Sequence, residues 1–513
     1  MNESTQYRNK GARFRWLRNL SVGAAVGVVV FLAVPGFHLA RTLWQDSPAA
    51  KNIVPEGHAD DVSRLNLTPV SEVWRIPDDA VQAEAQLREL LGRARMTGKR
   101  VSIAGARHSM GGHTIAPGGI VVDMRPFRSI QVDRDRSLLT VGSGAYWTEV
   151  LRRVDEVGLS VGVMQSDSAF SVGGSLSVNC HGWQFGSPPI ASTVESFRLM
   201  RADGTVVRCS RTENTELFSL ALGGYGLFGV ILEAEIRLVP NDRLRLVQEQ
   251  VPTALSGSIL NRLAEEPRPS LVYARLNVTT KDRFGTVLAS SYFPDKAGPI
   301  PILEEPGYSP LARAVFRGSV GSDYGKSLRW IAETWIQPHL LPEVVSRNRL
   351  LIETPDWYLN RHRNATDILH EYFMPRSVAL QFLKKADGII KKHGGDLLNT
   401  TVRDVAEDRD TVLRYAREPV IAFVMFFHQE RSLQGEASMK AMTRELVDSA
   451  LSGGGCYYLP YRLHPTTEQF HRAYPQARHF FQRKRFYDPD ELFQNTFYQT
   501  YGCSTVLSSD GGK

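Results

Sequence analysis

Cysteine is scarce in this chain, with four in 513 residues. Cys180, Cys209, Cys456 and Cys503 are too few and too scattered for a disulfide framework, and none is paired as CxxC. Structural zinc sites usually draw on such closely spaced pairs. We therefore expect neither a disulfide scaffold nor a metal site.

A large excess of one charge is also missing from most of the chain. The formal net charge is +7, from 61 Lys and Arg against 54 Asp and Glu. The first twenty residues supply +4 of it, because they hold five basic residues and one acidic residue. The rest carries about +3, which is no electrostatic footprint for nucleic acid, and we expect no nucleic-acid partner.

Long apolar runs are lacking, with one exception. Leu20 to Ala40 contains no Asp, Glu, Lys or Arg over 21 residues. As a helix it would reach about 31 Å, close to the hydrocarbon thickness of a bilayer. Basic residues precede it, which favours a single-pass transmembrane anchor with residues 1–19 in the cytoplasm and the catalytic part on the outer, extracytoplasmic side. A cleaved signal peptide, with a distant candidate site at 47–49, and a buried core helix are the alternatives.

The composition is otherwise that of a globular protein, with 42% hydrophobic, 22% charged and 9% aromatic residues. This excludes a disordered chain, a fibrous repeat and a multi-span membrane protein. After a linker at 41–63, residues 64–242 alternate strand and helix patterns and predict an α+β domain. The expected strands there are 100–105, 120–123, 138–141 and 230–239, the expected helices are 78–95, 148–157 and 216–222, and a hairpin is expected at 196–209.

Three glycine-bearing loops interrupt this domain, at Gly105–His113, Ser168–Gly182 and Gly223–Gly229. Small residues let backbone N–H groups approach a phosphate closely and surround it. Several such loops in one domain favour an extended ligand with a pyrophosphate. The alternative for any single loop is that its glycines only serve turns.

One glycine pattern resembles a nicotinamide-cofactor motif only as a string of letters. Gly224-x-Gly226-x-x-Gly229 follows a predicted helix and precedes a strand, the reverse of the Rossmann order. Gly142-Ser143-Gly144 has the right order but lacks the third glycine. We reject both as nicotinamide-cofactor sites.

Together the loops resemble the FAD-binding domain of the vanillyl-alcohol oxidase / p-cresol methylhydroxylase (PCMH-type) family of oxidoreductases. Gly105–Ser109 matches the G-x-x-H-S pyrophosphate loop, Ser171–Gly182 is similar to the second flavin loop, and Gly226–Val230 to part of the segment that closes the domain. The resemblance implies an α+β fold, with a two-lobed FAD-binding domain at 64–242 and an α+β substrate cap at 243–460. It also implies that residues 461–513 return to the FAD domain.

The resemblance implies FAD as cofactor and names the residues that would contact it. His108 matches the histidine that is often bonded covalently to the flavin, and His113 is a weaker candidate for that bond. A linking histidine must be neutral, nucleophilic and rigidly held. The candidate FAD contacts are Gly105, Ala106, Arg107, His108, Ser109, Met110, Gly111, Ser168, Ser171, Val172, Gly173, Gly174, Ser177, His181, Gly182, Gly229 and Val230.

Stretches of the second half resemble two groups of this family. Glu371–Arg376 and Thr401–Ala406 are similar to the cap strands of the alditol-oxidase group, in which an E-x-R strand faces the substrate. Here Arg403 is retained, but Thr401 stands where the carboxylate is expected, which counts against a polyol substrate. Strands are also expected at 271–278, 283–292 and 420–427, helices at 376–393 and 437–451, and a loop at 294–310.

The C-terminal run, Glu468–His471 followed by Asp488-Pro489 and Phe493, resembles decaprenylphosphoryl-ribose oxidase. Relatives place an active-site lysine before this run, where the present chain has Tyr461 and Arg462. A phenol can move a proton and a guanidinium can hold an anion.

The candidate catalytic residues are therefore Glu371, Arg403, Tyr461 and Arg462. For each of them a purely structural role remains the alternative, such as a charge in an ion pair. His428–Glu430, at the end of an aromatic-rich strand, is a weaker candidate.

These residues predict an FAD-dependent enzyme that oxidises a CH–OH group of a sugar, polyol, lactone or hydroxy acid by hydride transfer to flavin. Oxygen or a membrane electron carrier would then reoxidise the flavin. Two alternatives stay open at this point: a flavoprotein that oxidises a lipid-linked, polyprenyl-phosphate sugar, and a flavin-binding partner without turnover.

Overall fold

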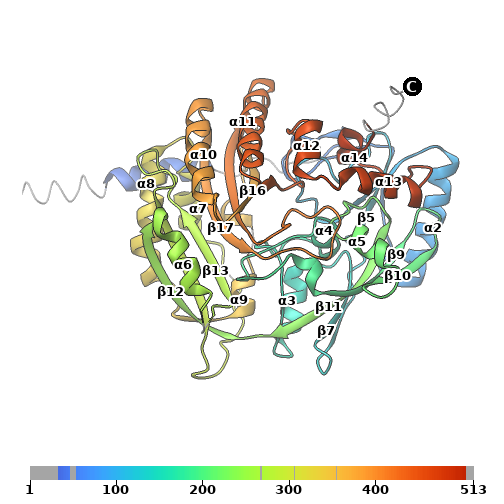
Figure 1. Ribbon diagram of the computed structural model, residues 1–513, viewed down its shortest axis with the longest axis horizontal. Coiled ribbons are helices and arrows are strands. Elements are labelled where there is room, and N and C mark those ends of the chain that lie inside the picture. Colours follow the sequence, from blue (N-terminus) through green and yellow to red (C-terminus); the bar gives the residue numbers. More distant parts are fainter. Residues whose placement is uncertain (1–32, 47–53, 266–267, 306, 354, 504–513) are drawn as a thin grey trace, which may run out of the picture.

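The computed structural model describes residues 33–46, 54–265, 268–305, 307–353 and 355–503 (Figure 1). Residues 20–32, the larger part of the predicted anchor, lie outside this range. Residues 33–45 form a helix. Among the described residues, we find no helix with both the length and the apolar character needed to cross a bilayer.

The described residues of the N-terminal half form two larger sheets and a two-stranded one. A parallel sheet of order β3-β5-β4 packs under helix α2, whose buried side includes Leu87 and Leu91. An antiparallel sheet has the order β10-β9-β11-β7-β6, with β8 also paired to β11. The elements are β3 (Glu72–Arg75), α2 (Ala80–Met96), β4 (Val101–Ala104), β5 (Ile120–Asp123), β6 (Ile130–Asp133), β7 (Leu138–Gly142), α3 (Trp147–Asp155), β8 (Leu159–Val161), α4 (Val172–Ser177), β9 (Val194–Met200), β10 (Val206–Ser210), α5 (Thr215–Ala221) and β11 (Val230–Pro240), after the short pair β1 (His58–Ala59) and β2 (Thr68–Pro69).

The C-terminal half is built on one antiparallel sheet of eight strands, in the order β15-β12-β14-β13-β17-β18-β16-β19. Helices α10 and α11 pack side by side against it near β16 (Figure 1). The elements are β12 (Arg243–Pro252), α6 (Ser256–Leu263), β13 (Leu271–Leu276), β14 (Thr286–Pro294), α7 (Pro310–Arg317), α8 (Asp323–Ile331), β15 (Val344–Ser346), α9 (Arg347–Leu351), β16 (Ala365–Pro375), α10 (Ala379–His393), β17 (Asp396–Val405), β18 (Val420–Glu430), α11 (Leu433–Ser452) and β19 (Cys456–Tyr457).

The last three helices, α12 (Thr467–Ala473), α13 (Ala477–Tyr487) and α14 (Thr496–Tyr501), lie on the side of the first half (Figure 1). Between α13 and α14 the chain pairs with β4: Val101 N donates to Leu492 O over 2.8 Å and Gln494 N donates to Val101 O over 2.9 Å. Phe493 is fully buried in the core shared with α2. The end of the chain thus completes the core of the first half.

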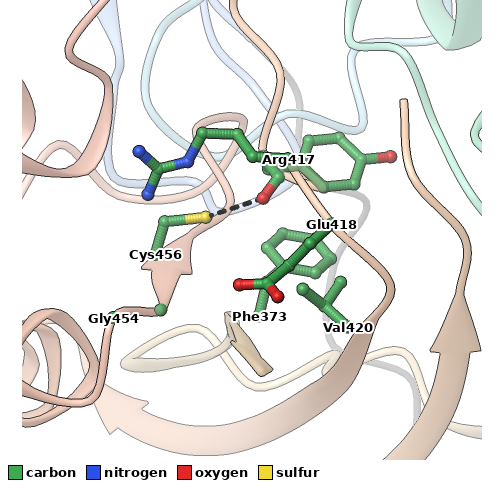
Figure 2. A pocket seen from close by; sticks show the side chains of 8 residues that line it. Phe373, Arg417, Glu418, Val420, Gly454 and Cys456 are labelled. Carbon is green, nitrogen blue, oxygen red and sulfur yellow. Dashed lines mark hydrogen bonds between the residues drawn. The ribbon is translucent and has the colours of Figure 1, made fainter. Parts of the chain in front are cut away.

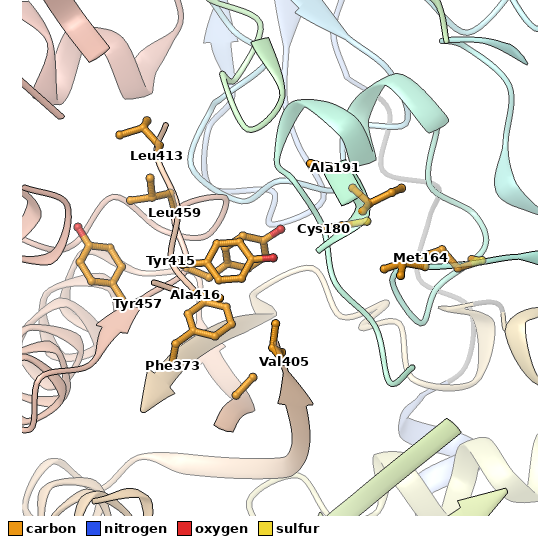
Figure 3. Close-up of a cluster of buried hydrophobic side chains, with 14 of the residues drawn as sticks. Met164, Cys180, Ala191, Phe373, Val405, Leu413, Tyr415, Ala416, Tyr457 and Leu459 are labelled. Atoms are coloured by element: carbon orange, nitrogen blue, oxygen red, sulfur yellow. The ribbon is translucent and has the colours of Figure 1, made fainter. Parts of the chain in front are cut away.

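A continuous apolar core joins the two halves (Figure 3). Met164 and Cys180 reach it from the first half, and Phe373, Val405 and Tyr415 from the second. The rings of Phe373 and Tyr415 stack, with centroids 4.2 Å apart. Because these side chains are packed against each other, the loops of the first half are held in register with the C-terminal sheet.

Most predicted elements occur within a few residues of their expected bounds, and the differences have local causes. β14 begins at Thr286 rather than 283, because Phe284 has φ +62° in a turn closed by Gly285 N donating to Asp282 O. α11 begins at Leu433 rather than 437, because the Ser432 side chain caps it. α10 begins at Ala379, after β16 has run on to Pro375.

Candidate functional site

A cavity of about 1580 Å³ lies between the three glycine loops and the C-terminal sheet. Its lining includes Gly105–Ser109 of the first loop, Ser171 and Gly174 of the second, and Gly226 of the third. The opposite wall includes side chains of β16 and β17. The glycine loops thus line one part of the cavity, and strands of the C-terminal sheet line another part.

The first two glycine loops contact each other, and the second loop also contacts the turn at Ser143. Ala106 N donates to the Oγ of Ser171 over 3.2 Å, and a Cβ on Gly105 would lie 1.9 Å from that oxygen. Gly173 N donates to Ser143 O over 2.8 Å, and a Cβ on Gly173 would lie 2.6 Å from the Cβ of Ser143. A side chain at either position would force these neighbours to shift, so the peptide groups pack closely along this wall.

Strained backbone and unpaired donors gather along the same wall. Arg107 and Tyr225, both lining the cavity, have φ of +60° and +54°, a region that non-glycine residues seldom adopt. Within the described part of the chain, several residues that line the cavity have buried polar atoms without a hydrogen-bond partner. On the glycine-loop side these atoms include Nε and Nη2 of Arg107, Oγ of Ser109, Oγ1 of Thr114 and Oγ of Ser143. Buried donors of this kind normally have partners, so the wall is suited to an oxygen-rich ligand.

His108 lies on the cavity wall and stacks on Phe170, with ring centroids 4.1 Å apart and planes 23° apart. Burial lowers the pKa of His108 to about 4, although a hydrogen bond with the backbone of Ala169 acts in the opposite direction. The imidazole is therefore neutral at physiological pH and held in place by packing. His113 also lines the cavity, and burial lowers its pKa to about 3.

Glu371, His181 and Tyr461 form a hydrogen-bonded group in the cavity wall. Nε2 of His181 lies 2.6 Å from Oε1 of Glu371, and the Tyr461 hydroxyl donates to Oε2 over 3.1 Å. Burial acts to raise the pKa of Glu371, but His181, the charge of Arg403 and Tyr461 outweigh it and hold the pKa below its usual range. Burial raises the pKa of Tyr461 well above its ordinary value. The group is thus an ionised carboxylate beside a neutral phenol.

Strand register explains how this carboxylate meets Arg403. Thr401 on β17 is opposite Val424 on β18, and Val424 is opposite Glu371 on β16. Glu371 therefore occupies the same level of the sheet as Thr401, two strands away, and both line the cavity. Arg403 donates to the Oγ of Ser166 over 2.7 Å. An acid and a guanidinium face the cavity even though Thr401 carries no charge.

Further charged side chains line the cavity. Glu333 pairs with Arg275 and, over 2.7 Å, with Nε of Arg329. Burial acts to raise the pKa of Glu333, but these two guanidinium groups lower it. Asp167 accepts from the Tyr358 hydroxyl over 2.8 Å, and burial raises the pKa of Asp167 to about 7. These residues add several charged and polar side chains to the cavity lining beyond the glycine loops.

The predicted site residues divide into two groups. Those that line the cavity are Gly105, Ala106, Arg107, His108, Ser109, Ser171, Gly173, Gly174, Ser177, His181, Gly229, Glu371, Arg403 and Tyr461. Those that do not are Met110, Gly111, Ser168, Val172, Gly182, Val230 and Arg462. Several of the second group support the loops through their backbone; Gly111, for example, packs against Tyr461 O, which a Cβ would approach to 2.5 Å.

Two of the candidate catalytic residues bind partners that lie outside the cavity lining. The guanidinium of Arg462 pairs with Glu436 and donates to Asn66 Oδ1 over 2.8 Å. His428 bonds to Asp367 over 2.7 Å and is also absent from the cavity lining. For both residues the purely structural alternative fits these contacts.

Several lining residues were not singled out as contacts from the sequence. Ser143 belongs to the Gly-Ser-Gly turn that we considered only as a nicotinamide motif, and Tyr225 belongs to the third glycine loop. Phe170 is adjacent to the second predicted contact loop. Arg275 and Glu353 carried no signal at all, because only tertiary contacts bring them to the cavity: Arg275 through the pairing of β13, and Glu353 through its carbonyl, which accepts from Ser168 N over 2.9 Å.

A second, smaller hollow of about 340 Å³ lies near β19 (Figure 2). It is lined by Phe373, Arg417, Glu418 and Gly454 among others, and Cys456 Sγ donates to Tyr415 O over 3.2 Å beside it. None of its lining residues belongs to the glycine loops. Arg417 and Glu418 are exposed. The chemistry therefore belongs to the larger cavity.

The four cysteines are free, three of them buried and Cys503 exposed. The described residues contain no group of three or more His, Cys, Asp or Glu side chains able to hold a metal ion.

Comparison with known protein families finds a match in the first half of the chain. Residues 80–210 match the family described as "FAD binding domain". This range begins with α2 and ends with β10, so it contains the first two glycine loops and His108. The unpaired donors and the close-packed peptide groups of these loops fit the diphosphate of FAD.

Known relatives match a part of the chain. L-gulonolactone oxidase of Mus musculus is 30% identical over 176 residues, covering 34% of this chain and 40% of the relative. Cytokinin dehydrogenase 2 of Arabidopsis thaliana is 34% identical over 140 residues, covering 27% of this chain and 28% of the relative.

Cytokinin dehydrogenase 7 of Oryza sativa subsp. japonica is 34% identical over 166 residues, covering 30% of this chain and 31% of the relative. The chain thus spans less than half the length of these curated relatives. The narrower resemblance to the alditol-oxidase and decaprenylphosphoryl-ribose-oxidase groups stays a prediction. The family match and the donor-rich wall agree: residues 80–210 match an FAD binding domain, and FAD is the cofactor that this match supports.

Proposed function

We propose that this protein is an FAD-dependent oxidoreductase that oxidises a CH–OH group of a small polar substrate. A sugar, lactone, polyol or hydroxy acid fits the polar side chains of the sheet wall. The likeness to L-gulonolactone oxidases supports a lactone or sugar within this class. The glycine loops would hold the diphosphate of FAD, with Arg107, Ser109 and Ser143 supplying hydrogen bonds.

The single observation that carries the proposal is the position of Glu371. An ionised carboxylate that is 3% exposed faces the same cavity as the FAD loops, held by His181 and Tyr461. Bound FAD supplies the hydride acceptor. Glu371 takes the hydroxyl proton, directly or through Tyr461, while Arg403 orients the substrate oxygen. Because Glu371 is held by two donors before substrate binds, little reorganisation is needed.

The test is reduction of the purified protein without air. We expect the yellow absorbance of the oxidised flavin to bleach with at least one member of a panel of sugars, lactones, polyols and hydroxy acids. Dithionite provides the reference for full reduction. Flavin that dithionite reduces and no alcohol substrate reduces would overturn the CH–OH proposal and favour a binding protein without turnover.

Glu371→Gln tests the proton acceptor. We expect the rate of flavin reduction by substrate to fall about 10²- to 10⁴-fold, because the amide keeps the shape but cannot accept a proton. Flavin content and reduction by dithionite should stay unchanged. Glu418→Gln, at an exposed position of the small hollow, is the matched control, and equal rates for both variants would contradict the role of Glu371.

A lipid-linked sugar is the second candidate substrate, because exposed apolar side chains such as Leu311 and Leu340 also line the cavity. We further propose that residues 20–40 anchor the chain in a membrane with the enzyme on the outer side, and that oxygen or a membrane carrier reoxidises the flavin. A polyprenyl-phosphate sugar included in the anaerobic panel separates this substrate from a water-soluble one.

A further inference from the structure

Exposed apolar side chains line part of the cavity. Apart from Val34 of the helix at 33–45, six of its lining residues are large, apolar and between 44% and 77% exposed; we call them the apolar rim. They are Tyr308, Leu311, Tyr324, Ile331, Ile336 and Leu340. Trp335, 71% exposed, is next to them in sequence. A contiguous apolar surface at an opening marks an interaction site rather than an ordinary solvated face.

The helix of residues 33–45 is fixed to this rim. His38 lies against Tyr324, with ring centroids 5.3 Å apart, and its Nε2 is 2.9 Å from Gly318 O. At the other end of the helix, Nη2 of Arg313 donates to Asp46 over 2.8 Å. Val34 and Leu39 of this helix themselves line the cavity. The helix and the rim therefore form one unit (Figure 1).

The sequence that leads into this helix indicates what covers the rim. The uncharged run from residue 20 to 40 ends within the helix, and five basic residues precede it between positions 8 and 18. Such a pattern partitions into a bilayer with its basic end at the headgroups. Because Val34 is both part of the run and part of the cavity lining, the described end of the run lies at the apolar rim. Tyr and Trp side chains, as at the rim, favour the membrane interface.

We propose that the apolar rim docks on the surface of a lipid bilayer, so that the cavity opens into the membrane interface rather than into bulk water. The docking is a second contact with the membrane, separate from the run at 20–40. An alcohol with an apolar tail would then reach the FAD loops without leaving the lipid; this last consequence rests on the proposed function, whereas the docking does not.

The experiment uses the full chain in lipid nanodiscs of phosphatidylcholine and phosphatidylglycerol. An environment-sensitive fluorophore is attached at Leu340→Cys in a Cys503→Ser background, since the other three cysteines are buried. The matched control carries the label at Met96→Cys. Met96 is 84% exposed at the end of α2, which lies at the opposite end of the molecule from α8 (Figure 1). Flavin absorbance reports that both variants are folded.

We expect the label at 340 to shift its emission to the blue, to lose at least half of its intensity when the lipids carry doxyl groups, and to be quenched several-fold less by iodide than the label at 96. Equal iodide quenching at the two positions would overturn the proposal. A label at 340 that is shielded from iodide but not quenched by doxyl lipid would also overturn it, because protein would then cover the rim. Neither readout depends on turnover, so the docking can fail while the proposed oxidation holds, and the reverse.

Discussion

His108 combines three properties that a flavin-linking residue needs. It lies in the cavity wall, it is fixed by stacking on Phe170, and burial lowers its pKa to about 4, so its imidazole is neutral and nucleophilic. His113 is buried in the same wall and neutral for the same reason. Position in the first glycine loop, not protonation state, separates the two residues.

We expect the yellow colour to stay with the polypeptide after acid precipitation of the wild-type protein, and to be released from His108→Ala. The measurement is absorbance of the supernatant and of the redissolved pellet. His113→Ala is the control and should keep its flavin bound to the pellet. Release of the flavin from the wild-type protein itself would show that the cofactor is held without a covalent bond.

Asp167 gives a pH dependence of stability with a definite sign. Burial raises its pKa from 3.8 to about 7, so the folded state binds a proton that the unfolded state has lost between these values. Stability from this group therefore falls as the pH rises from about 4 to 7. We expect the free energy of unfolding of Asp167→Asn to rise relative to that of wild type by up to about 4 kcal/mol over this pH range. One pKa unit corresponds to about 1.4 kcal/mol.

The measurement for Asp167 is denaturant unfolding at pH 4.5 and pH 8, for wild type and variant. Asp135→Asn, at an exposed position, is the control and should show no such change of difference. A difference between wild type and Asp167→Asn that is independent of pH would contradict the shifted pKa.

At the scale of elements, the contact between the first two glycine loops decides the shape of the FAD wall. Gly105→Ala would place a methyl carbon 1.9 Å from the Oγ of Ser171. We expect it to lower the free energy of unfolding by about 1–3 kcal/mol through overpacking, and to lower flavin content. Adding Ser171→Ala should restore part of both, because it removes the clashing oxygen.

The control for this loop contact is Gly92→Ala in the middle of α2. A Cβ at Gly92 meets nothing within 4 Å, so the substitution should stabilise the helix by about 0.5–1 kcal/mol. Unfolding curves and the flavin-to-protein absorbance ratio give both quantities. Full flavin content in Gly105→Ala would show that the two loops adjust independently.

At the scale of the whole molecule, the end of the chain completes the core of its beginning. Phe493 is fully buried beside β4, and its neighbours pair with Val101. We expect Phe493→Ala to cost about 3–5 kcal/mol of unfolding free energy and to lower flavin content. Phe486→Ala, 65% exposed on α13, is the control. Loss of flavin that is no greater in Phe493→Ala than in Phe486→Ala would show that the C-terminal segment does not support the FAD lobe.

The sequence alone determined the elements of the first half and the chemistry of its loops. Period and turn residues reveal α2, β5 and the hairpin of β9 and β10, because these signals are local. The G-x-x-H-S loop likewise carries its own signature. This is why FAD and the wall around His108 were predictable. The domain bounds drawn from the sequence stay predictions, because the family match reaches only residues 80–210.

Only the tertiary structure decided which charges meet at the sheet wall. From the sequence, Thr401 looked like the loss of a carboxylate, and Arg462 looked like an available guanidinium. The strand register across β16, β18 and β17 brings Glu371 to the level of Thr401 in the sheet. Glu436 forms an ion pair with Arg462. Strand pairing and burial act between residues that are far apart in the chain, so no local pattern records them.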